Sequence, residues 1–491
     1  MRRRSVPLGN TGFGCRCGTP ERVPVLIPDL VWRDGAFRTD LAVDIDPDSG
    51  RIRAVQDASG RTGQSPVHRL AGRALLPGFI NAHSHSFQRL LRGRAQWRPA
   101  SQRADFWSWR AVMYQVANAL SPDDLYDVAR FCFIEMLLAG WTSVGEFHYL
   151  HNDPSGHAYE SPFELAARVI AAAEDAGIRI RLLNVAYSTG GIGAPLAPEQ
   201  RRFATPDLEV YLRSTMELLE AMAPSRLVSI GVAPHSIRAV PRTWLRPIHA
   251  QAFGFDMPFH VHANEQPDEV AACLAAYGRR PIEVMTEEGV VDGLLTAVHA
   301  THVTHNEIAL LASNGPTVCA CPTTERDLGD GFLPGAEMMH AGARIAIGTD
   351  GQCLIDPFAE MRLLEYHERL RKLTRVVLAR PVGERLENAP VLLDAATISG
   401  AASLRLEAGA IEPGACADLV AIDLEHHALL GAQPENVAAA LALNAQPDVV
   451  CDVWVGGVQR VSDRQHVHAR EAGAAFARVA RRLHLQQGGW S

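Results

Sequence analysis

The sequence predicts an α/β protein with a (β/α)8 TIM-like barrel and a small β-sandwich domain built from the N- and C-terminal segments. Two patterns predict this fold. From residue 75 onward, apolar segments of strand length alternate with amphipathic segments of helix length, as in parallel βα units. Before residue 75, and again over residues 411–460, short strand-like runs are separated by turns. Eight parallel strands with helices between them close most economically into a barrel.

The domain boundaries follow these changes of pattern. We expect a disordered leader at residues 1–22, a small β domain at 23–75 plus 408–462, a metal-dependent barrel at 76–407, and a C-terminal helix and tail at 463–491. The leader begins with three arginines but has no apolar segment behind them, so it does not have the form of a secretory signal.

The barrel strands are expected where apolar runs of strand length recur. They are Leu75–His83, Thr142–Tyr149, Arg179–Tyr187, Leu227–His235, Pro258–Ala263, Thr296–Ala300, Pro316–Cys321 and Arg344–Asp350. Helical periodicity in the segments between them predicts helices at Leu125–Ala139, Glu164–Ala176, Tyr211–Ala223 and Glu360–Leu373.

Composition excludes several classes of function. A net charge of −8 provides no basic surface for nucleic acid or for an anionic membrane, and no apolar run reaches the roughly 20 residues that span a bilayer. The nine cysteines are scattered and odd in number, which predicts a reducing, cytoplasmic location. Lys372 is the only lysine, so neither a Walker A site nor a Schiff-base lysine is expected.

The pair His83 and His85 is the first indication of chemistry. It lies at the end of the first predicted barrel strand, and side chains two residues apart on a strand point the same way. Two imidazoles at this spacing can reach one metal ion at the barrel mouth. Such a pair is weak evidence alone, because histidines are common in strands.

Four further predicted strands end in polar residues. They carry His235, His262 followed by Glu265, His299, and Asp350. In a barrel enzyme the active site lies at the C-terminal ends of the strands, so these side chains are expected to meet there. Imidazole and carboxylate ligands suit Zn²⁺ or Fe²⁺, and such an ion lowers the pKa of bound water toward about 7. We therefore expect one divalent metal ion, with zinc favoured and iron as the alternative.

The segment Leu76–His85, together with His262, His299 and Asp350, resembles the amidohydrolase superfamily over roughly residues 23–460. Two-metal members of that superfamily bridge their ions with a carboxylated lysine, and here no lysine lies near a strand end. The resemblance therefore implies the one-metal branch, which is rich in deaminases. It implies His83, His85, His262 and Asp350 as metal ligands, and Glu265, His299 and Asp350 as catalytic groups. Of these, Glu265 would be the proton shuttle.

A narrower resemblance, to the formimidoylglutamate deiminase family, rests on short motifs. They are His83–Arg89, Phe106–Arg110, Glu146–Tyr149, His235–Arg238, His262–Gln266 and Leu328–Gly331. This likeness implies hydrolysis of N-formimidoyl-L-glutamate to N-formyl-L-glutamate and ammonia, in histidine degradation, by a homodimer. It implies a substrate pocket formed by Gln88, Arg110, Tyr149, His235 and Arg238. Guanidinium groups pair with carboxylates in a bidentate fork, which suits a small dicarboxylate substrate.

Two other functions are kept open by the sequence. One is a one-metal aminohydrolase acting on a purine, pyrimidine or triazine ring, and the other is a non-catalytic metal-binding barrel. Each arginine could also be an ordinary surface ion-pair residue. The family pattern has Ser-His after the metal-binding aspartate, whereas Gly351 and Gln352 follow Asp350, so the contacts behind this ligand are expected to differ.

Overall fold

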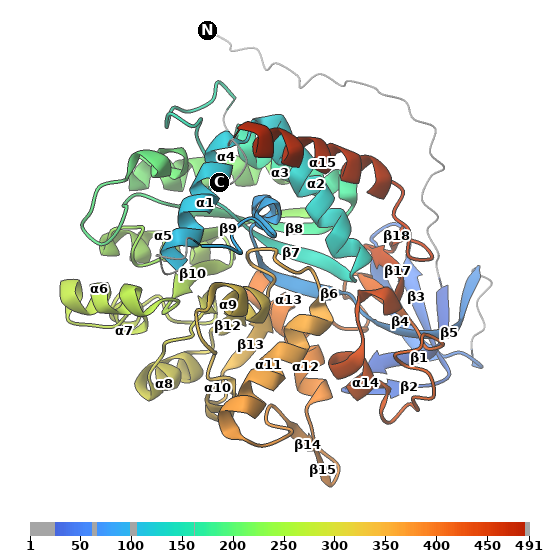
Figure 1. The fold of residues 1–491 in the computed structure, drawn as a ribbon. Coiled ribbons are helices and arrows are strands. Elements are labelled where there is room, and N and C mark those ends of the chain that lie inside the picture. The colour runs from blue at the N-terminus through green and yellow to red at the C-terminus, as the bar shows by residue number, and fades with distance from the viewer. Residues whose placement is uncertain (1–24, 61–65, 99–105, 162, 487–491) are drawn as a thin grey trace.

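The computed structural model describes residues 25–60, 66–98, 106–161 and 163–486. The predicted leader and the last five residues lie outside these ranges. Figure 1 shows a ring of helices around a central parallel sheet, with a smaller set of strands at one side. This confirms the predicted α/β barrel with a small β domain.

The barrel consists of eight parallel strands, and each lies where the sequence predicts one. They are β6 (Phe79–Ser84), β7 (Trp141–His148), β8 (Arg179–Ala186), β9 (Val228–Pro234), β10 (Phe259–Ala263), β11 (Leu295–His299), β12 (Thr317–Ala320) and β13 (Arg344–Ile347). Each strand pairs with the next along the chain. The last and first strands meet through a bridge between Ser84 and Asp350, which closes the barrel.

The first barrel strand begins later than the sequence predicts. The run from Leu75 is divided at Gly78, because β5 (Val67–Pro77) belongs to the small domain and β6 begins at Phe79. A Cβ atom added at Gly78 would lie 2.1 Å from the hydroxyl oxygen of Thr142 and would collide with it. The backbone of Gly78 instead donates a hydrogen bond to the carbonyl of Asp418. One continuous apolar run thus supplies a strand to each of two sheets, and the length of the run does not reveal where the first strand ends.

Helices surround the barrel. They are α1 (Phe106–Ala119), α2 (Pro122–Leu138), α3 (Glu164–Ala176), α4 (Leu208–Met222), α5 (Leu245–Gly254), α6 (Pro267–Tyr277), α7 (Pro281–Glu287), α8 (His305–Asn314), α9 (Pro322–Leu328), α10 (Gly335–Ala341), α11 (Pro357–Lys372), α12 (Ala389–Ala396), α13 (Ile398–Leu404), α14 (Val437–Asn444) and α15 (Ala469–Gln486). Short 3-10 turns lie at Ser86–Leu91, Pro198–Phe203, Arg242–Trp244 and Pro447–Val449. Capping side chains begin several helices: Ser121 and Asp124 form a capping box on α2, as Thr304 and Glu307 do on α8.

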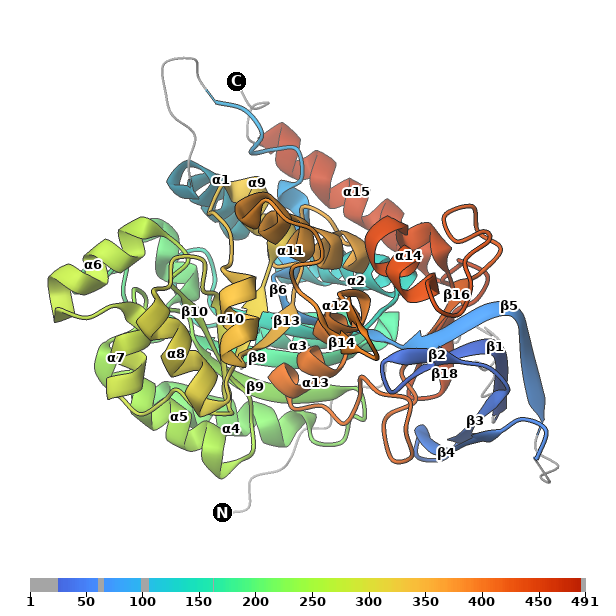
Figure 2. The same cartoon turned by 90° about the horizontal axis from the view of Figure 1, so that it is seen from below.

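The small domain is one mixed sheet. Its strands are β1 (Val25–Arg33), β2 (Ala36–Arg38), β3 (Leu41–Asp46), β4 (Arg51–Asp57), β5, β16 (Leu419–Asp423), β17 (Val450–Val455) and β18 (Val458–Val461). The two layers expected of a sandwich are thus parts of one hydrogen-bonded sheet. Its ends approach each other, since a Cβ added at Gly50 would lie 2.4 Å from the carbonyl oxygen of Gly456. The sheet encloses its own core, which includes Val43 and Trp454, and it lies to one side of the barrel (Figure 2).

Two further elements complete the chain. A hairpin of β14 (Arg380–Val382) and β15 (Arg385–Glu387) extends away from the barrel (Figure 1). The C-terminal helix α15 lies along α2, where Phe476 stacks on Phe131 with ring centroids 4.6 Å apart. Within the described ranges, the helices include none with the length and apolar content that a membrane crossing requires.

Candidate active site

Four predicted metal ligands lie together at the C-terminal end of the barrel. His83 is on β6, His85 directly follows it, His262 is on β10, and Asp350 comes after β13. Their ligand atoms all lie within 4.8 Å of one another, and all four side chains are buried. Asp350 Oδ1 is 3.5 Å from His83 Nε2 and 3.3 Å from His85 Nε2. Barrel closure therefore brings residues remote in the chain to one point.

Hydrogen bonding and burial favour the neutral form of the three imidazoles, which is the form that binds a metal ion. His85 and His262 each direct Nδ1 at a backbone carbonyl, of Phe147 at 3.0 Å and of His235 at 2.9 Å. A proton on Nδ1 leaves the Nε2 lone pair directed into the cluster. Burial lowers the pKa of His83 to about 3, and it also lowers the pKa of His85 and of His262, so these rings are neutral.

The aspartate completes a donor set that fits a single divalent cation. Burial alone would raise the pKa of Asp350, but the contacts with His83, His299 and His85 outweigh it and lower the pKa. His262 Nε2 and His83 Nε2 are 3.1 Å apart. Three neutral imidazoles and one ionised carboxylate, all facing inward, are ligands that Zn²⁺ and Fe²⁺ both accept.

A buried network supports the two strand ends that carry the ligands. Glu146 on β7 accepts hydrogen bonds from the hydroxyls of Ser84 and Ser86, each at 2.6 Å. Gln352 donates to Ser84 Oγ at 2.9 Å and to the Asp350 carbonyl at 3.0 Å. The residue that departs from the family pattern thus links the end of β6 to the loop after β13. Asp350 and Gln352 both have positive φ, of 46° and 58°, which only a well-supported loop maintains.

Glu265 and His299 lie beside the ligand cluster. Glu265 follows β10, and its Oε1 is 3.9 Å from His299 Nε2, which is 3.8 Å from Asp350 Oδ2. On its other side, His299 Nδ1 lies 3.3 Å from Oε1 of Glu325 in α9. Burial alone would lower the pKa of His299, but the hydrogen bond to Glu325 and the neighbouring carboxylates raise it to about 10. The imidazolium of His299 is therefore positively charged, and its Nε2 faces the carboxylates of Glu265 and Asp350.

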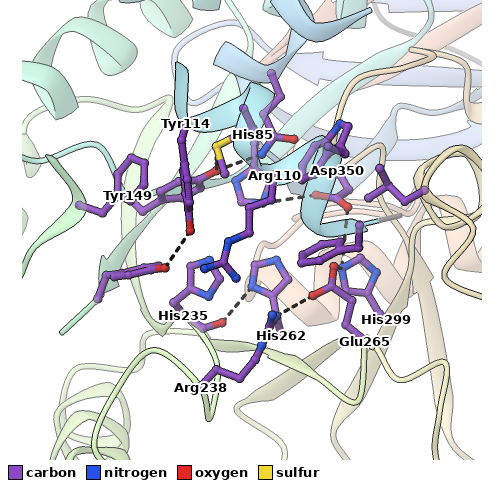
Figure 3. Close-up of a pocket in the computed structure, with 17 residues that line it drawn as sticks. His85, Arg110, Tyr114, Tyr149, His235, Arg238, His262, Glu265, His299 and Asp350 are labelled. Atoms are coloured by element: carbon purple, nitrogen blue, oxygen red, sulfur yellow. Dashed lines mark hydrogen bonds and ion pairs between the residues drawn. The ribbon is translucent and has the colours of Figure 1, made fainter. Parts of the chain in front are cut away.

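The five residues expected to bind substrate line one pocket with the ligand cluster at its base (Figure 3). They are Gln88, Arg110, Tyr149, His235 and Arg238. Gln88 donates to the Tyr149 hydroxyl at 2.9 Å. Burial lowers the pKa of His235 well below its usual value, so its ring is neutral.

The two arginines of the pocket differ in their surroundings. Arg110 stacks on the rings of Trp107 and Tyr114, with its guanidinium carbon 5.0 and 5.1 Å from their centroids, and no carboxylate of the described ranges pairs with it. Arg238 donates to Glu265 Oε2 at 2.8 Å. Neither is a surface ion-pair residue, because both side chains line the pocket (Figure 3).

Two buried carboxylates near the site have no counterpart in the sequence-based site. Glu325 contacts His299, and Glu269 lies near Arg238. Each is in the first turn of a short helix that closely follows a barrel strand, α6 after β10 and α9 after β12. This position at the start of a helix after a barrel strand could have indicated the two residues. It is a weak indication, because many acidic residues stand in the first turn of a helix only to stabilise it.

The barrel, the buried cluster of three histidines and one aspartate that could hold a metal ion, and the polar pocket beside it are the features of a metal-dependent hydrolase of the deaminase kind. Residues 74–460 match the model of the amidohydrolase family, and the chain belongs to that family. It is 37% identical to a formimidoylglutamate deiminase of Pseudomonas aeruginosa over 414 residues, which cover 84% of this chain and 90% of that protein.

Other similar proteins include deaminases named for other substrates and several solved structures. A 5-methylthioadenosine/S-adenosylhomocysteine deaminase of Haloarcula marismortui is 30% identical, over 92% of this chain and 98% of its own length. Among solved structures, an amidohydrolase from Brucella melitensis has a TM-score of 0.85 at 33% identity, covering 94% of this chain and 99% of its own. An adenosine deaminase from Xanthomonas campestris with bound zinc has a TM-score of 0.79 at 26% identity, covering 94% and 98%.

Proposed function

We propose that the protein hydrolyses N-formimidoyl-L-glutamate to N-formyl-L-glutamate and ammonia, a step of histidine degradation. One observation carries this proposal: two guanidinium groups, those of Arg110 and Arg238, line a pocket with the ligand cluster at its base. A substrate with a carboxylate at each end of its glutamyl part can satisfy both, because guanidinium and carboxylate groups form paired hydrogen bonds. The likeness to the Pseudomonas aeruginosa enzyme supports the same substrate.

The metal site would be formed by His83, His85, His262 and Asp350. A divalent cation bound there, zinc by preference or iron, would lower the pKa of a water molecule so that it attacks at neutral pH. Asp350 is ionised and belongs to the cluster, so it is placed to take the proton that the water loses. His299 carries positive charge toward the same point, where negative charge develops during the attack.

The reaction forms one C–O bond and breaks one C–N bond. The water oxygen adds to the formimidoyl carbon, both water hydrogens end on the terminal nitrogen, and that nitrogen leaves as ammonia. Glu265 transfers a proton to the terminal nitrogen, which is the role its position between the ligand cluster and the pocket supports. The arginines would fix the orientation of the glutamyl part so that the terminal nitrogen, and not the nitrogen of glutamate, faces Glu265, and ammonia therefore leaves.

The second candidate is a ring aminohydrolase. Several aromatic side chains line the pocket, among them Trp109, Tyr187 and Phe203, and these could contact a purine. Relatives that include an 8-oxoguanine deaminase of Pseudomonas aeruginosa are consistent with it. Against it, Tyr187 and Phe203 contact each other edge to face, with ring centroids 5.6 Å apart, so these two rings do not form parallel walls between which a purine could stack.

An ammonia-release assay tests the proposal. Metal-free protein is reconstituted with zinc or with iron and supplied with N-formimidoyl-L-glutamate, 5-methylthioadenosine or guanine. We expect ammonia, with N-formyl-L-glutamate as the second product, from the first compound alone. Turnover of a purine without turnover of N-formimidoyl-L-glutamate would replace the proposal by the second candidate. A protein that binds metal but releases ammonia from none would be a non-catalytic barrel.

A further inference from the structure

Arg238 lies between two glutamates. Its Nη2 donates to Glu265 Oε2 at 2.8 Å, and its Nε lies 3.5 Å from Oε1 of Glu269. Glu269 also accepts a hydrogen bond from the backbone N–H of Glu265, at 2.9 Å to Oε2. The three side chains are almost fully buried, with exposed fractions of 11% for Arg238, 8% for Glu265 and 0% for Glu269. One guanidinium is therefore shared by two carboxylates inside the protein.

The contact between Arg238 and Glu269 is incomplete. Neither Arg238 Nε nor Glu269 Oε1 has a hydrogen-bond partner among the described residues, although the two atoms face each other at 3.5 Å. Buried polar atoms of this kind cost free energy until they are paired. A small rotation of the guanidinium toward Glu269 would pair both atoms. Such a rotation would give Arg238 a second position in which its charge faces a carboxylate.

The hydrogen bond from Arg238 restricts the proton transfer proposed for Glu265. The shuttle proposed above must turn its carboxylate toward the terminal nitrogen of the substrate. The hydrogen bond from Arg238 to Oε2 at 2.8 Å restrains this rotation, although Oε1 faces His299 and is not held by Arg238. Breaking a buried ion pair without replacement is costly, because it leaves an uncompensated charge. A carboxylate of the substrate can replace Glu265 on Arg238 directly, since it offers the same charge and the same geometry.

We propose, on the basis of the function proposed above, that Glu269 is a positioning residue that lets Arg238 exchange Glu265 for a substrate carboxylate. Binding of the glutamyl carboxylate then releases Glu265 toward the reacting nitrogen. Discrimination against compounds without a carboxylate comes from the chemical step as well as from binding. Glu269 makes the exchange possible because Arg238 never lacks a charged partner during it.

The test separates the two parts of the substrate. N-propylformamidine carries the formimidoyl group without any carboxylate, and glutarate supplies the carboxylates without a reacting group. With wild-type holoenzyme, saturating glutarate is expected to raise kcat for N-propylformamidine by about tenfold or more, a modest part of what a positioned proton donor contributes. Simple competitive inhibition by glutarate, or no effect on kcat, would overturn the exchange.

A variant identifies the part played by Glu269. Glu269→Gln keeps an oxygen acceptor for the Glu265 backbone but removes the charge, so we expect activation by glutarate to fall below about twofold, with metal content unchanged. Glu365→Gln is the matched control, because Glu365 is fully buried, pairs with Arg369 at 2.7 Å and lies on α11. A merely structural role for Glu269 would lower stability in both variants and leave the activation ratio intact, which would contradict the proposal.

The proposed function and the exchange fail in different ways. If the wild type releases no ammonia from N-formimidoyl-L-glutamate, the proposed function is wrong and the exchange falls with it. If ammonia is released but glutarate does not activate N-propylformamidine hydrolysis, the exchange alone is wrong.

Discussion

Asn81 and Thr349 join the first strand of the barrel to the segment after the last one. The Thr349 backbone N–H donates to Asn81 Oδ1 at 3.0 Å, and Asn81 Nδ2 donates to Thr349 Oγ1 at 2.6 Å. Both side chains are fully buried. A side-chain amide thus adds to the backbone pairing at this seam, where the Asp350 N–H donates to the His83 carbonyl at 3.0 Å. The seam positions the metal ligands, because His83 is two residues from Asn81 and Asp350 adjoins Thr349.

Replacing Asn81 tests the importance of this seam. Asn81→Ala leaves the Thr349 N–H without its acceptor, so we expect the free energy of unfolding to fall by about 1–3 kcal/mol and zinc affinity to fall with it. Denaturant titration and zinc competition measure the two quantities. Asn184→Ala is the matched control, since buried Asn184 on β8 donates to the Thr215 hydroxyl at 2.8 Å. Equal loss of zinc affinity in both variants would contradict a special role for the seam.

Glu265→Gln tests the proton shuttle. The amide retains the size of the side chain and lies outside the ligand cluster, so the metal content should remain that of the wild type. Loss of a positioned acid–base group is expected to lower kcat by about 10²–10⁴-fold. Metal analysis and steady-state ammonia release check both expectations. An unchanged kcat would remove Glu265 from the mechanism.

Arg110→Gln tests the recognition of the dicarboxylate. Arg110 lines the pocket without a carboxylate partner in the described ranges, so its replacement should weaken substrate binding and alter the chemical step little. A charge-assisted hydrogen bond of about 1.5–3 kcal/mol corresponds to a rise in KM of about tenfold to a hundredfold. Kinetics with N-propylformamidine provide the control, because a substrate without carboxylates should not respond. The same loss for both substrates would argue against the pocket assignment.

His367 provides a test of pH dependence away from the metal ligands. Burial, with a smaller effect of Arg326, lowers the pKa of His367 to about 4, whereas the unfolded chain binds this proton near pH 6.5. The unfolded state therefore binds the proton more readily between these values, and stability falls as the pH drops from 6.5 to 4. The loss is roughly 3 kcal/mol when complete.

The variant His367→Phe keeps a ring in place without a titrating group. Urea unfolding of the metal-free protein between pH 4 and pH 8 should show a shallower loss of stability in the variant than in the wild type. The other buried histidines are common to both proteins and cancel in the comparison. Parallel curves would show that His367 does not carry the effect.

The fold and the meeting of the four candidate metal ligands could be predicted because they depend on local patterns. Each barrel strand is an apolar run, and the ligands stand at or just beyond the strand ends, so His262 and Asp350 could be placed at the same edge without knowledge of any contact. The division of the first run at Gly78 could not be predicted, because it depends on the approach of Thr142 from the neighbouring strand.

The polar contacts of the site depend on tertiary geometry and were not predictable. The sequence places Arg238 in the substrate pocket but gives no sign of its pairing with Glu265, which lies in the loop after the next barrel strand. The partner of His299 is Glu325, which reaches it only because α9 turns back over the barrel mouth after β12. Sequence shows which residues carry charge, but it does not show which of them meet.

The mixed sheet of the small domain has a consequence for synthesis of the chain. Strand β5 pairs with β1 on one side and with β16 on the other, and β16 is separated from it by the entire barrel. Until the ribosome has made Leu419–Asp423, one edge of β5 exposes unpaired backbone beside apolar side chains, which is a template for association with other chains. We expect chains that stop before β16 to aggregate even when their barrel is complete, so proteins shortened at the C-terminus in this way should be recovered as insoluble material.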